Sequence, residues 1–125
     1  MFEWIEGNVT SLILTITSSS ITLNASAANY FKEVRWCMVG IDKKQMLLGI
    51  KPIKKIDIDR KIVSTSQLHK ITIGKGYARI TNKAISDQIA NLLNQTLTNE
   101  KISAYYDEDQ EMLLADLHEL KQMEV

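Results

Sequence analysis

The sequence predicts an α+β fold, a small pseudo-symmetric β-barrel built from two β-α-β-β repeats with two short helices. Two segments, residues 11–53 and 69–117, follow one order of strand, Asn, short helix, strand, acidic turn and strand. Neither segment can bury its apolar face alone, so we expect the two to pack together as one unit. A closed or nearly closed barrel is favoured because closure removes the exposed strand edges.

Length and composition predict one domain over residues 1–125, with a polar connector at 54–68. An apolar fraction of 45% and a charged fraction of 24% are ordinary for a globular protein. The single cysteine, Cys37, excludes an intrachain disulfide framework and fits a reducing compartment. An acidic N-terminal segment and the lack of an apolar run of about 20 residues predict a cytoplasmic protein with no membrane contact.

The secondary structure of the first repeat is predicted from β-branched runs, polar turns and one helix cap. Its elements are a strand at 11–17, a turn at 18–20, a strand at 21–23, a helix at 25–33, a strand at 35–41, a turn at 42–45 and a strand at 46–50. Asn24 is the expected N-cap, because its side chain can accept from the first free amides of the helix. Pro52 is expected to end the last strand, because proline cannot donate to a ladder.

The connector and the second repeat are read in the same way. The connector is expected to hold one strand, at 56–58 or at 62–63. The second repeat then has strands at 70–73 and 77–81, a longer helix after Asn82, a strand at 101–106, a turn at 107–110 and a strand at 111–117. Gly74-Lys75-Gly76 between the first two strands fits a hairpin turn that needs positive φ better than a phosphate-binding loop.

The formal net charge of zero hides an uneven distribution of charge. Residues 51–83 carry nine bases and two acids, whereas residues 84–125 carry two bases and nine acids. Such asymmetry is typical of a polyanion-binding face opposed by an acidic face. The alternative is that the two signs mix on the folded surface and simply keep the protein soluble.

Four places in the first repeat carry a family resemblance: Ile21-Thr22-Leu23-Asn24, the Ala-rich helix ending in Phe31, Val39-Gly40-Ile41-Asp42, and Gly49-Ile50-Lys51-Pro52. Together they resemble the AbrB/MazE/SpoVT family of prokaryotic DNA-binding modules, in which two chains interlock into a swapped-hairpin (cradle-loop) barrel. The resemblance covers residues 20–53 best and 78–117 more loosely. Two departures are that Asn replaces the family's usual Pro before each helix and that both copies lie in one chain, so a homodimer is left open.

The resemblance implies a small prokaryotic or phage regulatory protein that binds double-stranded DNA. In the family, basic residues on the strand and turn before the helix contact DNA, and the matching positions of the second repeat are Lys75, Arg79 and Lys83. The first repeat has only small residues there, among them Ser20 and Thr22. The connector bases compensate if they share that face; the expected supporting residues are Lys51, Lys54 and Lys55.

The alternative function is a protein-binding module, such as an antitoxin, an inhibitor or a phage adaptor, without DNA binding. It would use the acidic second half against a basic partner surface; the candidate residues are Asp107, Glu108, Asp109 and Glu111. These four carboxylates lack the glycine and the distal glutamate of an EF-hand loop, so a solvated turn is favoured over a calcium site.

No enzyme, metal site or cofactor is predicted. His69 and His118 have no Cys or carboxylate partners at metal-ligand spacing, and no nucleophile elbow is present. Tyr105 and Tyr106 point to opposite faces of a strand, so at most one of them faces a ligand. We expect the other to pack in the core, together with Trp36.

Overall fold

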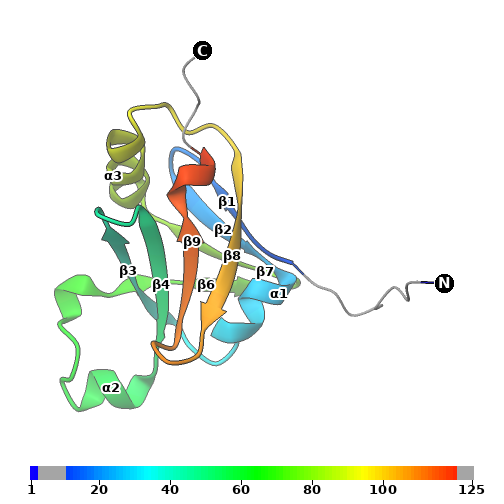
Figure 1. The fold of residues 1–125 in the computed structure, drawn as a ribbon. Helices are drawn as coiled ribbons and strands as arrows, with labels where there is room; N and C mark the ends of the chain where they lie inside the picture. Colours follow the sequence, from blue (N-terminus) through cyan, green and yellow to red (C-terminus); the bar gives the residue numbers. More distant parts are fainter. Residues whose placement is uncertain (3–10, 121–125) are drawn as a thin grey trace.

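The computed structural model describes residues 1–2 and 11–120 (Figure 1). Residues 3–10, which hold most of the acidic N-terminal segment used to predict localisation, and residues 121–125 lie outside this description. Within the described residues, nine strands form one antiparallel sheet in the order β5-β3-β4-β9-β8-β1-β2-β7-β6. Their bounds are β1 Leu12–Ile16, β2 Ser20–Asn24, β3 Trp36–Asp42, β4 Leu47–Ile53, β5 His69–Lys70, β6 Thr72–Gly74, β7 Tyr77–Thr81, β8 Glu100–Asp107 and β9 Met112–Asp116.

The sheet curves into a nearly closed barrel because its two end strands are continuous in sequence. β5 pairs with β3, and after Ile71 the chain continues as β6, which pairs with β7. The Ile71 N–H donates to the Arg35 carbonyl at 3.0 Å, so even the residue between the two strands is tied to the segment before β3. A small α+β barrel is therefore confirmed, whereas the descent of its halves from one repeat stays a prediction.

Short helices accompany the sheet. Their bounds are α1 Ala25–Ala28, α2 Lys55–Asp59 and α3 Lys83–Leu93, with 3-10 turns η1 Asn29–Phe31, η2 Thr65–Gln67 and η3 Leu117–Leu120. Of the described helices, none is long and apolar enough to cross a membrane.

Alternate residues of the strands point into the barrel and form the core. The side chains with at most 1% of their surface exposed include Leu14, Ile16, Leu23, Leu48 and Ile80. Burying each such side chain contributes about 1.5–3 kcal/mol. Cys37 lies in the same core, where burial raises the pKa of its thiol to about 12.

Both predicted capping asparagines cap helices. The Asn24 Oδ1 accepts from the Ala27 N–H at 3.1 Å, and the Asn82 Oδ1 accepts from the Ile85 N–H at 3.3 Å. Asn24 also bonds to β1, because its Oδ1 accepts from the Ile13 N–H at 3.2 Å and its Nδ2 donates to the Ser11 carbonyl at 2.7 Å.

The two predicted acidic turns join β3 to β4 and β8 to β9, and they share one geometry. In each turn an aspartate Oδ1 accepts from the backbone N–H groups two and three residues later: Asp42 from Lys44 and Gln45, and Asp107 from Asp109 and Gln110. In each, the residue four positions after the aspartate has positive φ: 57° at Met46 and 52° at Glu111.

Three expectations were wrong. The connector forms helix α2, where a strand was expected at 56–58 or at 62–63, because its backbone groups bond locally: the Asp57 N–H donates to the Lys54 carbonyl and the Arg60 N–H to the Ile56 carbonyl, both at 3.0 Å. Pro52 lies inside β4, in the part of that strand that β9 does not pair with. Trp36 is 40% exposed rather than in the core. Tyr106, by contrast, is partly buried and stacks on Tyr30, with ring centroids 4.0 Å apart.

Candidate functional site

One polar surface lies on the outer side of five neighbouring strands, β8, β1, β2, β7 and β6. The strand register places Lys101 beside Thr15, Thr15 beside Thr22, Thr22 beside Arg79 and Arg79 beside Thr72. We call this surface the hydroxyl face and define it by Thr15, Thr17, Ser20, Thr22, Thr72, Arg79, Thr81, Asn99 and Lys101. A shallow depression of about 490 Å³ lies in it, and its described lining contains seven Ser, Thr or Asn residues, Arg79 and no carboxylate.

The guanidinium of Arg79 is held in place at the centre of the hydroxyl face. Its Nε donates to the Thr22 Oγ1 at 3.2 Å, and its Cζ lies 5.2 Å from the centre of the Tyr77 ring. Cation–π contact and the hydrogen bond together orient the guanidinium plane. In the part of the chain that the structure describes, no carboxylate forms a salt bridge with Arg79. Its terminal N–H groups can therefore serve a bound anion.

Gly74 fixes the position of the Tyr77 ring. A Cβ atom at Gly74 would lie 2.3 Å from two ring carbons of Tyr77, so the ring rests against the bare backbone of the paired strand. Gly76 has φ of 82°, a conformation that favours glycine, as the predicted hairpin turn requires. The run Gly74-Lys75-Gly76 thus supports the side chain against which Arg79 lies.

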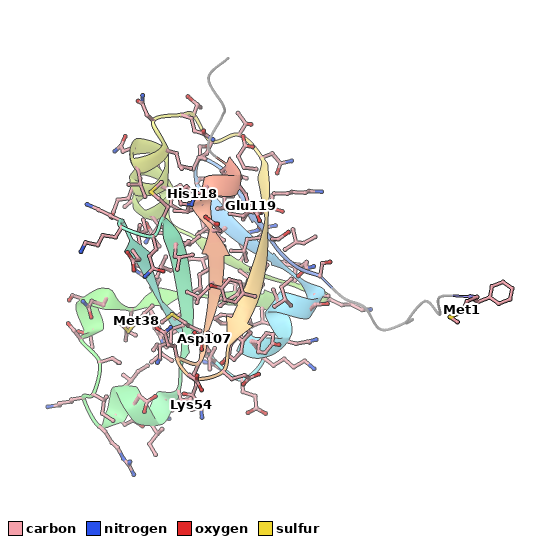
Figure 2. The ribbon with its side chains drawn as sticks, viewed as in Figure 1. Met1, Met38, Lys54, Asp107, His118 and Glu119 are labelled. Atoms are coloured by element: carbon pink, nitrogen blue, oxygen red, sulfur yellow. The ribbon has the colours of Figure 1, made fainter. Side chains whose placement is uncertain are left out.

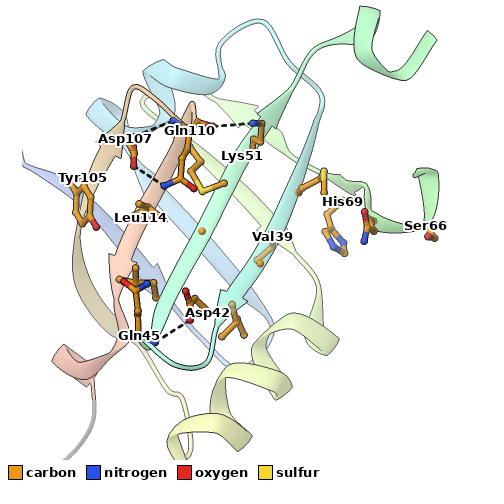
Figure 3. A pocket seen from close by; sticks show the side chains of 17 residues that line it. Val39, Asp42, Gln45, Lys51, Ser66, His69, Tyr105, Asp107, Gln110 and Leu114 are labelled. Atoms are coloured by element: carbon orange, nitrogen blue, oxygen red, sulfur yellow. Dashed lines mark hydrogen bonds between the residues drawn. The ribbon is translucent and has the colours of Figure 1, made fainter. Parts of the chain in front are cut away.

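A larger concave surface lies on the outer side of β3, β4, β9 and β8 (Figure 3). Its volume is about 980 Å³, and we call it the hairpin groove. Apolar residues form much of it: Met38, Leu47, Met112, Leu114 and the 52% exposed Tyr105. Gly40 and Gly49 pair directly across two strands and add no side chain to the floor.

The two acidic turns bound opposite ends of the hairpin groove, with Asp42 and Gln45 at one end and Asp107 and Gln110 at the other (Figure 3). Hydrogen bonds from the backbone and side chain of Gln110, and from the Asp109 N–H, hold the pKa of Asp107 below its usual range. At the other end, Asp116 lies in β9, and the backbone N–H and ring of His118 lower the pKa of this carboxyl group.

The six basic residues predicted to bind DNA fall into separate groups. Arg79 lies on the hydroxyl face, Lys75 lies in the turn before Tyr77, and Lys83 begins α3 and pairs with Asp87 at 3.0 Å. Lys51, Lys54 and Lys55 lie along β4 and the start of α2. The Lys51 Nζ donates to the Gln110 carbonyl at 3.0 Å, and Figure 2 places Lys54 and Asp107 at the same end of the molecule. Charges of the basic connector and the acidic half therefore mix at that end.

The acidic residues proposed for protein binding lie in and beside the β8–β9 turn. Asp107 ends β8, where its carboxylate bonds to the turn, whereas Glu108, Asp109 and Glu111 are exposed. Among the described residues, no cluster of three or more His, Cys, Asp or Glu side chains could hold a metal ion.

Sequence reasoning missed several residues of both surfaces, including Lys101, Thr15, Gly40 and Leu114. A signal for the hydroxyl face was present, because Ser or Thr occupies alternate positions at Thr15 in β1 and Thr17 just after it, and at Ser20 and Thr22 in β2. The groove gave no comparable signal, since its residues come from two hairpins far apart in sequence.

No family model matches this chain, and neither a curated protein nor a solved structure matches it. The resemblance to the AbrB/MazE/SpoVT family therefore stays a prediction.

Proposed function

We propose that this protein binds double-stranded DNA through the hydroxyl face. The observation that carries the proposal is the oriented guanidinium of Arg79 on a surface whose described lining holds hydroxyl groups and no carboxylate. Arginine, serine and threonine are among the side chains that contact DNA phosphates, and a row of such donors on neighbouring strands suits a duplex backbone. Lys101 and Lys75 add positive charge at the margin of the face.

This proposal narrows the set of residues expected to bind DNA. Lys51 is engaged by the acidic turn and Lys83 by Asp87, so these two side chains have less capacity to neutralise phosphates. Thr22 is one of the small residues that the first repeat has where the second repeat has basic ones. Its Oγ1 accepts a hydrogen bond from the Arg79 Nε. In this proposal the DNA contact depends on one arginine supported by hydroxyl groups. It does not need a basic patch in each of the two repeats.

The test is a fluorescence-anisotropy titration of labelled duplex DNA with the wild type, Arg79→Ala and the control Arg60→Ala. Both variants remove one positive charge, but Arg60 follows α2, away from the hydroxyl face. We expect Arg79→Ala to weaken binding about tenfold and to reduce the slope of log K against log salt by about 1. The control should retain the wild-type slope. The proposal is wrong if the wild type shows no salt-sensitive affinity for duplex DNA, or if both variants behave alike.

A further inference from the structure

We infer that the hairpin groove is the docking surface for a second copy of this chain, so that two barrels associate as a two-fold symmetric dimer. This inference goes beyond DNA binding and does not depend on it. The groove spans β3, β4, β9 and one end of β8, whereas the hydroxyl face is centred on β1, β2 and β7.

The floor of the groove has the character of a protein contact surface. Met38, Met112 and Tyr105 keep part of their apolar surface open to solvent. Gly40 leaves the centre of the groove open, because it adds no side chain and a Cβ atom there would meet nothing within 4 Å. A contiguous apolar surface rimmed by polar groups, enriched in Met and Tyr, is typical of protein–protein interfaces.

Charge complementarity points to a second copy as the occupant. The β3–β4 turn at one end of the groove exposes Lys43 and Lys44, whereas the β8–β9 turn at the other end exposes Glu108, Asp109 and Glu111. Within the described residues, none of these five side chains forms a salt bridge. Counting the turn residues, Asp42, Lys43 and Lys44 sum to +1 at one end, and Asp107, Glu108, Asp109 and Glu111 sum to −4 at the other, of which Lys51 beside Gln110 offsets one. The surface therefore still carries opposite net charges at its two ends.

A single two-fold axis brings opposite charges together at both ends of the hairpin groove. The axis lies in the plane of the groove, perpendicular to the line that joins the two turns. Rotation about it places each Lys43–Lys44 turn against the acidic turn of the other copy, and the two apolar floors face each other. Such an interface is self-complementary, as a symmetric dimer requires. The two carboxylates at the basic end have partners within the chain: Asp42 accepts from the Lys44 and Gln45 N–H groups, and Asp116 contacts the His118 ring at 2.8 Å.

The test is a charge-swap experiment read by analytical ultracentrifugation over a concentration series. The wild type should approach twice the chain mass of 14.2 kDa. Lys43→Glu/Lys44→Glu makes both ends acidic, and Glu108→Lys/Asp109→Lys/Glu111→Lys makes both ends basic. Each variant alone should raise the dimer dissociation constant about tenfold or more, because like charges then meet at both ends. An equimolar mixture of the two variants should restore a dimer, since every contact between unlike variants is again attractive.

Gly40→Phe is a neutral companion variant. A Cβ atom at this position meets nothing within 4 Å, and aromatic residues suit a strand, so we expect the variant to fold, with its ring projecting into the groove, and to remain monomeric. A wild type that stays monomeric at all concentrations would overturn the inference and leave the groove to another partner. A dimer that survives both charge variants and Gly40→Phe would also overturn it, because that dimer would use another surface.

Discussion

We expect the Asn24 side chain to contribute more to the free energy of unfolding than the Asn82 side chain, although both cap helices. Each side-chain oxygen accepts from a helix N–H, and loss of such a cap costs about 1 kcal/mol. Asn24 also accepts from Ile13 N–H and donates to the Ser11 carbonyl, so it holds β1 to the start of α1. Each of these two further hydrogen bonds contributes about 1 kcal/mol. Asn24→Ala should therefore lower the free energy of unfolding by about 3 kcal/mol.

The Asn82 side chain makes one further contact, between its Nδ2 and the His69 Nδ1 at 3.2 Å. Asn82→Ala should therefore cost about 2 kcal/mol, roughly 1 kcal/mol less than Asn24→Ala. Asn24→Asp is the matched control: it keeps the two acceptor bonds, loses the donor to Ser11 and sets a carboxylate oxygen near the exposed Ser11 carbonyl. Its cost should exceed about 1 kcal/mol but stay below that of Asn24→Ala.

The assay is urea unfolding at neutral pH, followed by far-UV circular dichroism, with the slope m compared among the variants. If Asn24→Ala destabilises no more than Asn82→Ala, the second role of Asn24 in holding β1 is refuted. If Asn24→Asp costs as much as Asn24→Ala, the acceptor bonds contribute nothing and the reasoning from the cap fails.

Three further predictions concern single side chains. The Ser86 Oγ is buried without a hydrogen-bond partner in the described structure, so Ser86→Ala should raise the free energy of unfolding by about 1 kcal/mol in the same urea assay. With its pKa raised to about 12, the Cys37 thiol should resist a thiol reagent at pH 8 in the folded protein and react at once in urea; equal rates would contradict its burial. The pKa of Asp107 is lower in the folded protein than in the unfolded chain, so its stabilising contribution is present at neutral pH and is lost as pH falls through the folded value. The difference in free energy of unfolding between the wild type and Asp107→Asn should therefore shrink below about pH 4. A difference that grew as the pH fell would contradict the lowered pKa of Asp107.

Local sequence signals predicted the parts of the fold that depend on near neighbours. Asn24 and Asn82 were read correctly because a cap bonds to an amide only three residues away. The turns at Asp42 and Asp107 likewise bond within three residues. The connector was misread because Ile56-Asp57-Ile58 alternates like a strand, and over three residues alternation does not distinguish a strand from one turn of helix.

The surfaces depend on register, which a single sequence does not fix. Arg79 meets Thr22 across a separation of 57 residues, and Lys51 meets Gln110 across 59. These contacts exist because β2 pairs with β7 and β4 pairs with β9. A shift of one residue in either ladder would turn the outward side chains inward. The sequence therefore indicated which residues were basic or acidic, but not which of them would become neighbours.

The two proposed surfaces lie on different parts of the barrel wall, so docking through the hairpin groove would leave both hydroxyl faces of a dimer open. A dimer would then contact one duplex twice, and the second contact would be intramolecular, with a high effective concentration. Gly40→Phe separates this effect from charge, because it alters no ionisable group. A short duplex with room for one copy should bind the wild type and Gly40→Phe equally. A longer duplex should bind the wild type more tightly and with a steeper salt dependence. Equal affinities on the longer duplex would show that DNA binding at Arg79 does not use the dimer.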